Sequence, residues 1–425
     1  MVVAALCAGA AGGGGSLGAE PSVPAAKVLT SGERQSAGFR LEGGALVPAM
    51  NRFGLSLAQK MEAHYGAGRN LFISPISLDY TLLMLTNGAS GATQTAFRRT
   101  LGIENAPLAS LNGEADLLRS YLAFPARTGS GAAPAEWRMA NGIWVNSAGL
   151  LRAHGSVPAA FVRTCAANFG ATARAVDFAG DGADIINKTV SEATHGKIPH
   201  IVQKPIVGDL ALTNAVYFKA GWQNTFDAHY TKPAPFTTGT GTKVSLPMMV
   251  QTERFGYRKG TGFAAARLPF QTEGATCAMY VFLPNKSGDY SEIWAALAES
   301  AAVRRRAFAS QKLDLMLPRF KIETNEPGML DYLKAQGMSG SGDLSAMGLP
   351  IAAITKAIHK TYLKVDETGA EAAAATAIVM LTGSAAPRPE TPIPFHVNRP
   401  FVCAIVEEDT GAILFAGVVN DPAGK

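Results

Sequence analysis

The stretch from residue 367 to residue 394, ETGAEAAAATAIVMLTGSAAPRPETPIP, combines segments with different structural preferences. Four alanines follow Glu371, and alanine has the highest intrinsic helix propensity. The next residues, Thr376 to Leu381, are mostly branched and apolar and favour a strand. The Gly, Ser, Ala and Pro residues after them favour neither. Local preferences therefore do not predict one structure for this stretch, and its role has to be inferred from the other motifs of the chain.

The composition predicts a large folded core. Of the 425 residues, 47% are hydrophobic and 17% are charged, which is neither a disordered nor a collagen-like composition. The formal net charge is +5, with acids and bases alternating along most of the chain. The densest basic cluster, residues 304–306, is interpreted as a solvated face, because no aromatic residues alternate with it to stack on bases. We expect no nucleic-acid partner.

The cysteines and histidines do not predict a metal site. The four cysteines lie far apart and form no CxxC pair: Cys7, Cys165, Cys277 and Cys403. Neither a zinc site nor a disulfide framework is therefore expected, and the last three are predicted to be small buried hydrophobes. His195 and His200 do not have the spacing of metal ligands on a helix. No cofactor is implied.

The N-terminal segment resembles the later part of a signal peptide. Residues 1–26, MVVAALCAGAAGGGGSLGAEPSVPAA, are apolar and then rich in Gly and Ala. Cys7 is a candidate lipid anchor, although Leu6 before it fits that interpretation poorly. We expect residues 1–45 to be a targeting or linker segment and the protein to be secreted, either periplasmic or extracellular.

The remaining chain mixes helices and strands without strict alternation. Apolar residues at three- and four-residue steps predict a helix over 47–65. Ser74 is expected to cap a second helix in which Pro75 is the first residue and which ends at residues 87–88. Further helices are expected at 183–195 and 289–310, and loops near 126–136, 337–344 and 382–394. Seven later runs, from LALTNAVYF to AILFAGVV, favour strands, so the fold class is α+β.

No arrangement of residues typical of an enzyme is present. The one G-x-S-x-G match, residues 14–18, lies in the low-complexity tail rather than between a strand and a helix. No P-loop, dinucleotide fingerprint or H-E-x-x-H motif occurs. The acidic run 407–409 precedes Thr410-Gly411 and is better explained by a hairpin turn.

Taken together, the segments resemble the serpin family over residues 46–425. The matching motifs follow in family order: NLFISPIS (70–77), LLMLTNGASGATQ (82–94), ANGIW (140–144), INKTVSEATHGKI (186–198), LTNAVYFKAGWQNTF (212–226), LPMM (246–249), LPRFKI (317–322), AIHKTYLKVDETGAEAAAAT (357–376), FHVNRPFVCAI (395–405) and ILFAGVVNDP (413–422). Thr189 stands where the family usually has tryptophan.

The resemblance implies one domain of three β-sheets and eight or nine helices, with an exposed reactive-centre loop at about 367–394. It also implies a suicide-substrate inhibitor of serine proteases and, as a further option, of cysteine proteases. The target protease cleaves the loop, and the N-terminal arm of the loop then inserts as a new strand into the main sheet. We expect a monomer that is not an enzyme. The alternative is a non-inhibitory, serpin-like binding protein or chaperone.

The residues of the hinge suit such an insertion. By resemblance the hinge comprises Glu367, Thr368, Gly369, Ala370, Glu371, Ala372, Ala373, Ala374, Ala375 and Thr376. Alternate residues of a strand face opposite sides, so the even-numbered residues from 370 to 380 would share the buried face. All of these are uncharged, and none is proline. Ala370 stands where family members usually carry Thr or Ser.

Other matched positions would hold the sheet closed before cleavage. By resemblance, Ser74, Ser77, Asn214 and His359 form a polar cluster beneath the point where the sheet opens. Trp222 and the pair of Arg319 with Glu367 match the point of first insertion, where we expect a salt bridge. Ordinary helix capping and core hydrogen bonding would also explain the four polar residues.

The cleavage site is placed by the family's spacing. Counting from Glu367, the reactive bond falls between Gly383 and Ser384. Cleavage after Met380 or Leu381 would suit chymotrypsin-, elastase- or subtilisin-like enzymes, whereas Arg388 would suit trypsin-like ones. We favour a target that accepts small or apolar residues.

Overall fold

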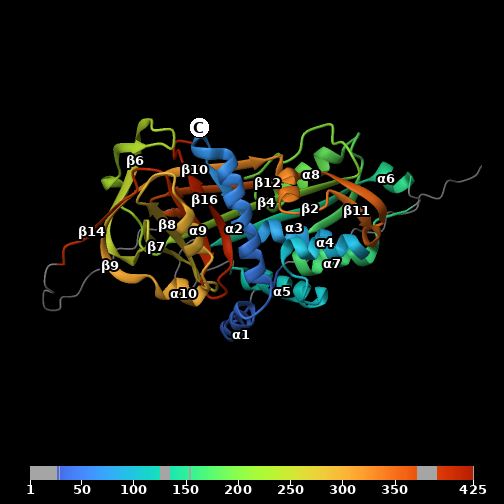
Figure 1. Cartoon of the computed structure of the whole chain (residues 1–425), viewed down its shortest axis with the longest axis horizontal. Coiled ribbons are helices and arrows are strands. Elements are labelled where there is room, and N and C mark those ends of the chain that lie inside the picture. Colours follow the sequence, from blue (N-terminus) through green and yellow to red (C-terminus); the bar gives the residue numbers. More distant parts are fainter. Residues whose placement is uncertain (1–25, 28, 125–134, 153–154, 371–389, 425) are drawn as a thin grey trace, which may run out of the picture.

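The computed structural model describes residues 26–27, 29–124, 135–152, 155–370 and 390–424 (Figure 1). Its α-helices are α1 (Ser31–Glu42), α2 (Leu46–Tyr65), α3 (Pro75–Gly88), α4 (Gly91–Leu101), α5 (Leu108–Tyr121), α6 (Ser147–Arg152), α7 (Ala159–Phe169), α8 (Gly182–Ala193), α9 (Ser291–Leu297), α10 (Ala301–Arg306) and α11 (Met329–Ala335). Its strands are β1 (Leu71–Ile73), β2 (Glu136–Asn146), β3 (Thr172–Val176), β4 (Leu210–Trp222), β5 (Lys232–Thr237), β6 (Lys243–Lys259), β7 (Phe263–Gln271), β8 (Cys277–Pro284), β9 (Ala309–Pro318), β10 (Phe320–Glu326), β11 (Ser341–Leu344), β12 (Leu349–Asp366), β13 (Gly369–Ala370), β14 (Ile393–His396), β15 (Phe401–Glu407) and β16 (Ile413–Val419).

The sixteen strands of the described residues are connected by pairing and divide into three sheets, with β11 paired to the first half of β12 outside the orders below. The first has the order β3-β2-β4-β12-β10, with β13 between β4 and β12 at one end. The second runs β1-β16-β15-β8-β7-β6, and the third runs β5-β6-β9-β14. The long β6 belongs to both, and a two-residue pairing of β4 with β7 links the first sheet to the second. The α+β class and the three sheets are confirmed.

The helices predicted at 47–65 and from Pro75 to residues 87–88 are present as α2 and α3. Helix α2 begins at Leu46, and α3 begins at Pro75 after Ser74, whose side chain accepts a hydrogen bond from the Ser77 amide. This bond satisfies one of the amides that the first helical turn leaves without a partner. Helix α3 is buried along nearly its whole length, and it therefore fixes the position of everything packed around it.

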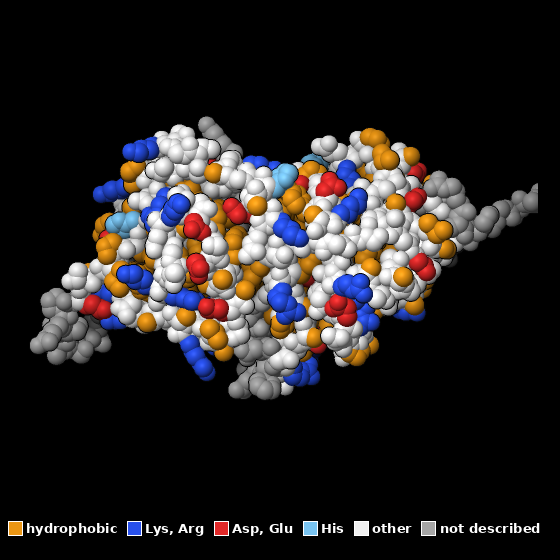
Figure 2. All heavy atoms as spheres, viewed as in Figure 1, with side chains coloured by type: hydrophobic (Ala, Val, Ile, Leu, Met, Phe, Trp, Pro, Cys, Tyr) orange, Lys and Arg blue, Asp and Glu red, His pale blue; other side chains and the backbone are white. Residues whose placement is uncertain are grey.

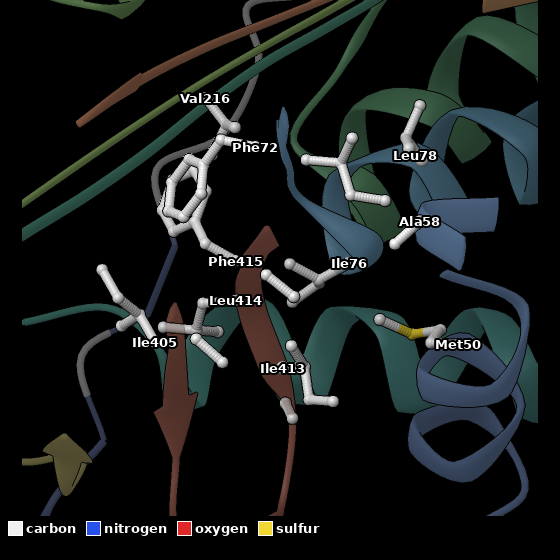
Figure 3. Packing of buried hydrophobic residues seen from close by; sticks show 14 of the residues in the cluster. Met50, Ala58, Phe72, Ile76, Leu78, Val216, Ile405, Ile413, Leu414 and Phe415 are labelled. Carbon is white, nitrogen blue, oxygen red and sulfur yellow. The ribbon is translucent and has the colours of Figure 1, made fainter. Parts of the chain in front are cut away.

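A continuous apolar core joins α2 and α3 to the second sheet. Figure 3 shows Ile76 of α3 close to Ile413 of β16, while the ring of Phe72 lies over that of Phe415. The two rings are stacked with centroids 5.0 Å apart. A separate apolar cluster covers the other face of the first sheet and includes Ile186 and Val190 of α8. The first sheet is therefore covered on both faces, with α3 on one side and α8 on the other (Figure 1).

Three expectations differ from the structure. The region 289–310 contains two short helices and the start of β9, because Ser300 caps a new helix and Ala309 pairs with Tyr257. Residues 341–344 form β11 rather than a loop. The described residues form eleven α-helices instead of eight or nine, and one of them, α1, lies in the segment 1–45.

The basic cluster 304–306 is not a solvated face throughout: the interpretation was wrong for Arg304. Arg304 is only 2% exposed, because its guanidinium donates to the carbonyl oxygen of Glu299. Arg305 pairs with Asp409 at 3.0 Å. Figure 2 shows basic and acidic side chains interspersed on the visible face of the molecule.

Candidate functional site: the junction of β4 and β12

The central feature of the first sheet is a direct pairing between two parallel strands, here named the seam. Residues from Ile354 to Tyr362 of β12 pair in parallel with Leu210 to Tyr217 of β4, through eight residue pairs. Strand β2 continues the sheet beyond β4, and β10 continues it beyond β12. Parallel pairs are slightly less stable per residue than antiparallel pairs, so the seam is the weakest type of contact available to these two strands.

At one end of the seam a third strand already lies between the two. Ala370 pairs antiparallel with Ala220 of β4 and with Val365 of β12, and it is fully buried. Gly369 pairs with Gly221 and Asp366 in the same way. The first residues of the hinge are therefore part of the sheet, and the residues from 367 to 370 are not an exposed loop.

Gly369 cannot be replaced without moving its neighbours. Its φ is +150°, a conformation that L side chains rarely adopt, and a Cβ would lie 2.1 Å from the carbonyl oxygen of Ala220. Only glycine therefore fits where the chain turns from β12 back between the strands. The preceding Thr368 supports this turn, because both its amide and its hydroxyl donate to Asp366 Oδ1, at 3.0 and 2.6 Å.

An ion pair holds the residue before the turn. The Arg319 Nε lies 2.7 and 2.8 Å from the two carboxylate oxygens of Glu367, so the expected salt bridge is formed. Thr231 also donates its hydroxyl to Glu367. Burial opposes ionisation of Glu367, but the hydrogen bonds from Arg319 and Thr231 outweigh it and hold its pKa below the ordinary value.

Trp222 is the last residue of β4 and packs against this end of the sheet. Its indole stacks on Phe270 with ring centroids 4.6 Å apart, and its Nε1 donates to the carbonyl oxygen of Asp366 at 2.9 Å. Its amide donates to the carbonyl oxygen of Thr368. Trp222 thus ties the end of β4 to the chain that leaves β12.

Midway along the seam, the four predicted polar residues meet beneath the sheet. Asn214 of β4 and His359 of β12 are paired in the seam, and the His359 Nδ1 and the Asn214 Oδ1 share a hydrogen bond. The Ser74 amide donates to His359 Nε2 at 3.1 Å, and Asn214 Nδ2 donates to Ser77 Oγ at 2.8 Å. All four are at most 2% exposed. The polar cluster therefore joins both strands of the seam to the start of α3.

Burial fixes the protonation state of His359. Because the Ser74 amide donates to Nε2, that nitrogen must carry a lone pair, and Nδ1 carries the proton donated to Asn214. Burial lowers the pKa of His359 to about 3, so the ring is neutral at pH 7. The cluster is a network of neutral hydrogen bonds with no ion pair at its centre.

Two members of this cluster were missed in the sequence. Asn141 of β2 accepts hydrogen bonds from Ser77 Oγ and Asn214 Nδ2, both at 2.9 Å, and Thr81 accepts from Asn214 at 3.1 Å. Asn141 lies in the ANGIW motif, where a lone amide in an apolar strand was the available signal. Thr81 gave no signal beyond its place one helical turn after Ser77.

The other predicted positions lie outside the described residues. These are the rest of the hinge (Glu371, Ala372, Ala373, Ala374, Ala375 and Thr376) and the candidate cleavage positions (Met380, Leu381, Gly383, Ser384 and Arg388). The described part of the chain begins again at Glu390. Residues from Ile393 form β14, which pairs in parallel with β9. Both ends of the stretch 367–394 are therefore anchored in sheets.

No metal or membrane site accompanies these features in the part of the chain that the structure describes. No group of three or more His, Cys, Asp or Glu side chains there has an arrangement that could hold a metal ion. None of the described helices combines the length and the apolar character needed to cross a membrane.

A family model matches nearly the whole described chain: the model "Serpin (serine protease inhibitor)" covers residues 48–422. The chain therefore belongs to the serpin family. Among known proteins, the chain is 32% identical over 390 residues to an uncharacterized serpin-like protein of Thermococcus kodakarensis, covering 89% of this chain and 86% of the relative. It is 30% identical over 404 residues to leukocyte elastase inhibitor of Bos taurus (89% and 99% covered) and 29% identical over 388 residues to intracellular coagulation inhibitor 2 of Tachypleus tridentatus (88% and 91%).

Solved structures share the fold. Serpin48 of the insect Tenebrio molitor superposes with a TM-score of 0.70 at 25% identity, over 90% of this chain and 98% of that one. Thyroxine-binding globulin in complex with thyroxine superposes with a TM-score of 0.73 at 25% identity, over 88% and 99%. The family thus includes a protein named as a protease inhibitor and one named for binding a small molecule.

Proposed function

We propose that this serpin inhibits serine proteases by inserting its cleaved loop into the seam. The observation that carries the proposal is β13: Gly369 and Ala370 already pair with both strands at the open end of the seam. A loop freed by cleavage would continue the same pairing toward the polar cluster. Each added residue would replace one parallel contact by two antiparallel contacts, which favours insertion.

The register of β13 makes this proposal specific. Continued from Ala370, the antiparallel pairing would bring Thr376 between Asn214 and His359 in the inserted form. Ala370 belongs to the apolar core on the α3 face of the sheet. Because successive residues of a strand alternate, the other even-numbered residues up to Met380 would lie on the same face. About twelve inserted residues would move a tethered protease by roughly 40 Å. Their ladder bonds would contribute roughly 6–18 kcal/mol.

The chemistry would follow the ordinary acyl-transfer steps of the protease. Its serine Oγ attacks the carbonyl carbon of the scissile bond, the peptide C–N bond breaks, and the new amine leaves with the C-terminal fragment. The N-terminal arm stays joined to the serine as an ester. Insertion then pulls on that ester and disorders the triad or oxyanion hole, and losing either slows deacylation by about 10²–10⁴-fold. Insertion must be faster than hydrolysis of the ester.

We propose a target that accepts small or apolar residues, with the bond Gly383–Ser384 as the first choice. The similarity to leukocyte elastase inhibitor supports this class. The test is incubation with elastase, chymotrypsin, subtilisin and trypsin, followed by electrophoresis in SDS and mass spectrometry of the released C-terminal peptide. A stable complex with the first three and a peptide starting at Ser384 are expected. A stable complex with trypsin and a peptide starting at Pro389 would contradict the target class, and the absence of any complex would contradict inhibition.

A non-inhibitory binding role is the second candidate. The similarity to thyroxine-binding globulin supports it. Against it, the hinge residues in the sheet are small and uncharged, as insertion requires. The two candidates differ in the loop-cleaved protein, because only an inserting sheet gains stability on cleavage.

Export remains a prediction from the N-terminal residues. Mass spectrometry of protein isolated from the native host, after cell fractionation, would show whether residues before about 27 are removed or whether Cys7 carries a lipid. A full-length chain in the cytosolic fraction would contradict export.

A further inference from the structure

The seam opens at one particular residue pair. The parallel pairing of β4 with β12 ends at Tyr217 and Tyr362. Three residues further on, Ala220 and Val365 no longer pair with each other but with the two sides of Ala370. Tyr217 and Tyr362 are therefore the last closed pair in front of the inserted hinge. Any strand that enters the seam from this end has to separate them first.

These two tyrosines touch across the seam. They lie on the face of the sheet opposite the polar cluster, because Asn214 is three residues before Tyr217 and successive residues alternate. The ring centroids are 6.3 Å apart, with planes inclined by 56°. Tyr217 is 3% exposed and Tyr362 is half-buried. One inserted strand would add about 4.8 Å between the two chains, which would end this contact.

Two lysines reach the Tyr362 ring from different parts of the molecule. Lys321 Nζ lies 5.3 Å from the ring centroid and Lys197 Nζ lies 5.9 Å from it, both within cation–π distance. Lys321 belongs to β10, which pairs with β12. Lys197 follows α8, which packs on β2 beyond β4. The segment after α8 also reaches across to β12, because Lys360 Nζ donates to the carbonyl oxygen of His200.

We propose that Tyr217, Tyr362 and Lys197 form a latch that controls how readily the seam opens ahead of an entering strand. The inference rests on the proposed function, because it concerns the same insertion. When β4 and β12 separate, the Tyr217–Tyr362 and Lys197–Tyr362 contacts both break. The Lys321–Tyr362 contact persists, since β10 moves with β12. Lys321 is therefore an internal control: it contacts the same ring but does not bridge the seam.

The test measures seam opening without any protease. A synthetic peptide with the sequence of residues 372–381, AAAATAIVML, carries a fluorophore, and its uptake by the full-length, uncleaved protein is followed by fluorescence anisotropy. The peptide begins two residues after Ala370, so the hinge can keep its position. Tyr362→Val removes the ring but keeps a residue suited to a strand. Tyr362→Phe keeps the ring, and Tyr257→Val removes a tyrosine ring from β6, away from the seam.

We expect Tyr362→Val to take up peptide about tenfold faster than the wild type, which corresponds to about 1.4 kcal/mol. Tyr362→Phe and Tyr257→Val should stay within about twofold of it. Lys197→Met should accelerate uptake about threefold, and Lys321→Met should leave it unchanged. If Tyr362→Val does not fold, comparing peptide uptake by Lys197→Met with that by Lys321→Met still tests the latch.

Two results would overturn the latch in distinguishable ways. Equal uptake by Lys197→Met, Lys321→Met and the wild type would overturn the latch and leave loop insertion intact. If the folded wild type and all variants took up no peptide, insertion itself would be contradicted, and the latch with it.

Discussion

The hinge end of the seam and the polar cluster hold the same two strands in opposite ways. At the hinge end, Ala370 separates β4 from β12, and the nearby ion pair includes Arg319, whose side chain is 44% exposed. At the cluster, Asn214 and His359 join the strands directly through buried, neutral hydrogen bonds. A neutral network can be exchanged for new hydrogen bonds when a strand enters, whereas a buried ion pair would be costly to break. The two strands are thus already separated at one end and joined directly in the middle.

The largest expected effect comes from a charge at the hinge. In Ala370→Arg, the guanidinium would replace a fully buried methyl group between two strands. An unpaired buried charge costs about 3–5 kcal/mol, so the yield of stable protease complex should fall by at least about 100-fold, and the loop should be cleaved as a substrate. Gel densitometry at increasing inhibitor-to-protease ratios measures this. The matched control is Ala309→Arg at the exposed first residue of β9, which should behave like the wild type.

Asn214→Ala would break the polar cluster. Its removal leaves His359 Nδ1 without an acceptor, at about 1–3 kcal/mol, and takes one hydrogen bond each from Ser77 Oγ and Asn141 Oδ1, which still bond to each other. We expect the native state to lose about 3 kcal/mol of unfolding free energy in urea. The exposed Asn325→Ala on β10 serves as control. A loss below about 1 kcal/mol would mean that the cluster does not seal the seam.

The pH dependence follows from His359. Because the folded-state pKa is about 3 and the ordinary value is 6.5, the unfolded chain binds a proton between these limits that the folded chain does not. The contribution is therefore complete above pH 6.5 and is lost as the pH falls; at pH 5 the loss is about 2 kcal/mol. Urea unfolding at pH 8 and pH 5 checks this against His359→Gln, which should lack this component. Equal pH dependence in both proteins would contradict the buried neutral histidine.

The smallest effect is expected at the Arg319–Glu367 ion pair, in which Arg319 is 44% exposed and Glu367 is buried. Arg319→Gln should cost about 1 kcal/mol, because solvent screens the exposed guanidinium and the Thr231 hydroxyl still donates to Glu367. Arg254→Gln, which removes a more exposed pair with Glu390, is the control. A loss as large as that of Asn214→Ala would show that the two ends of the seam are held equally, contrary to the comparison above.

Local signals in the sequence predicted much of this arrangement. Ser74 and Pro75 mark the start of α3 through capping chemistry, and the motifs around Asn214 and His359 brought the polar cluster together in the correct strands. A helix cap depends on residues adjacent in sequence, and the polar cluster was predicted from motifs that occur in the same order as in the family. The roles of these residues in insertion stay predictions.

What the sequence did not predict depends on contacts distant along the chain. Helix α1 has few apolar residues, of which Ala37 and Leu41 join the core. Its buried Arg34 donates to the carbonyl oxygens of Tyr121 and Ala123. Arg304 is buried in a similar way, with its guanidinium donating to the carbonyl oxygen of Glu299. The pairing of Ala370 with both strands depends on the local turn at Gly369 and also on β4, which is about 150 residues away in sequence.

The central claim is that the sheet accepts the severed loop as a new strand. Limited proteolysis within residues 380–388, followed by differential scanning calorimetry of the intact and cleaved proteins, tests it most directly, with cleaved Ala370→Arg as the control that should show no gain. The cleaved wild type is predicted to melt about 8–22 °C above the intact protein, because the ladder hydrogen bonds of the inserted strand contribute roughly 6–18 kcal/mol. An unchanged melting temperature after complete cleavage would contradict the account.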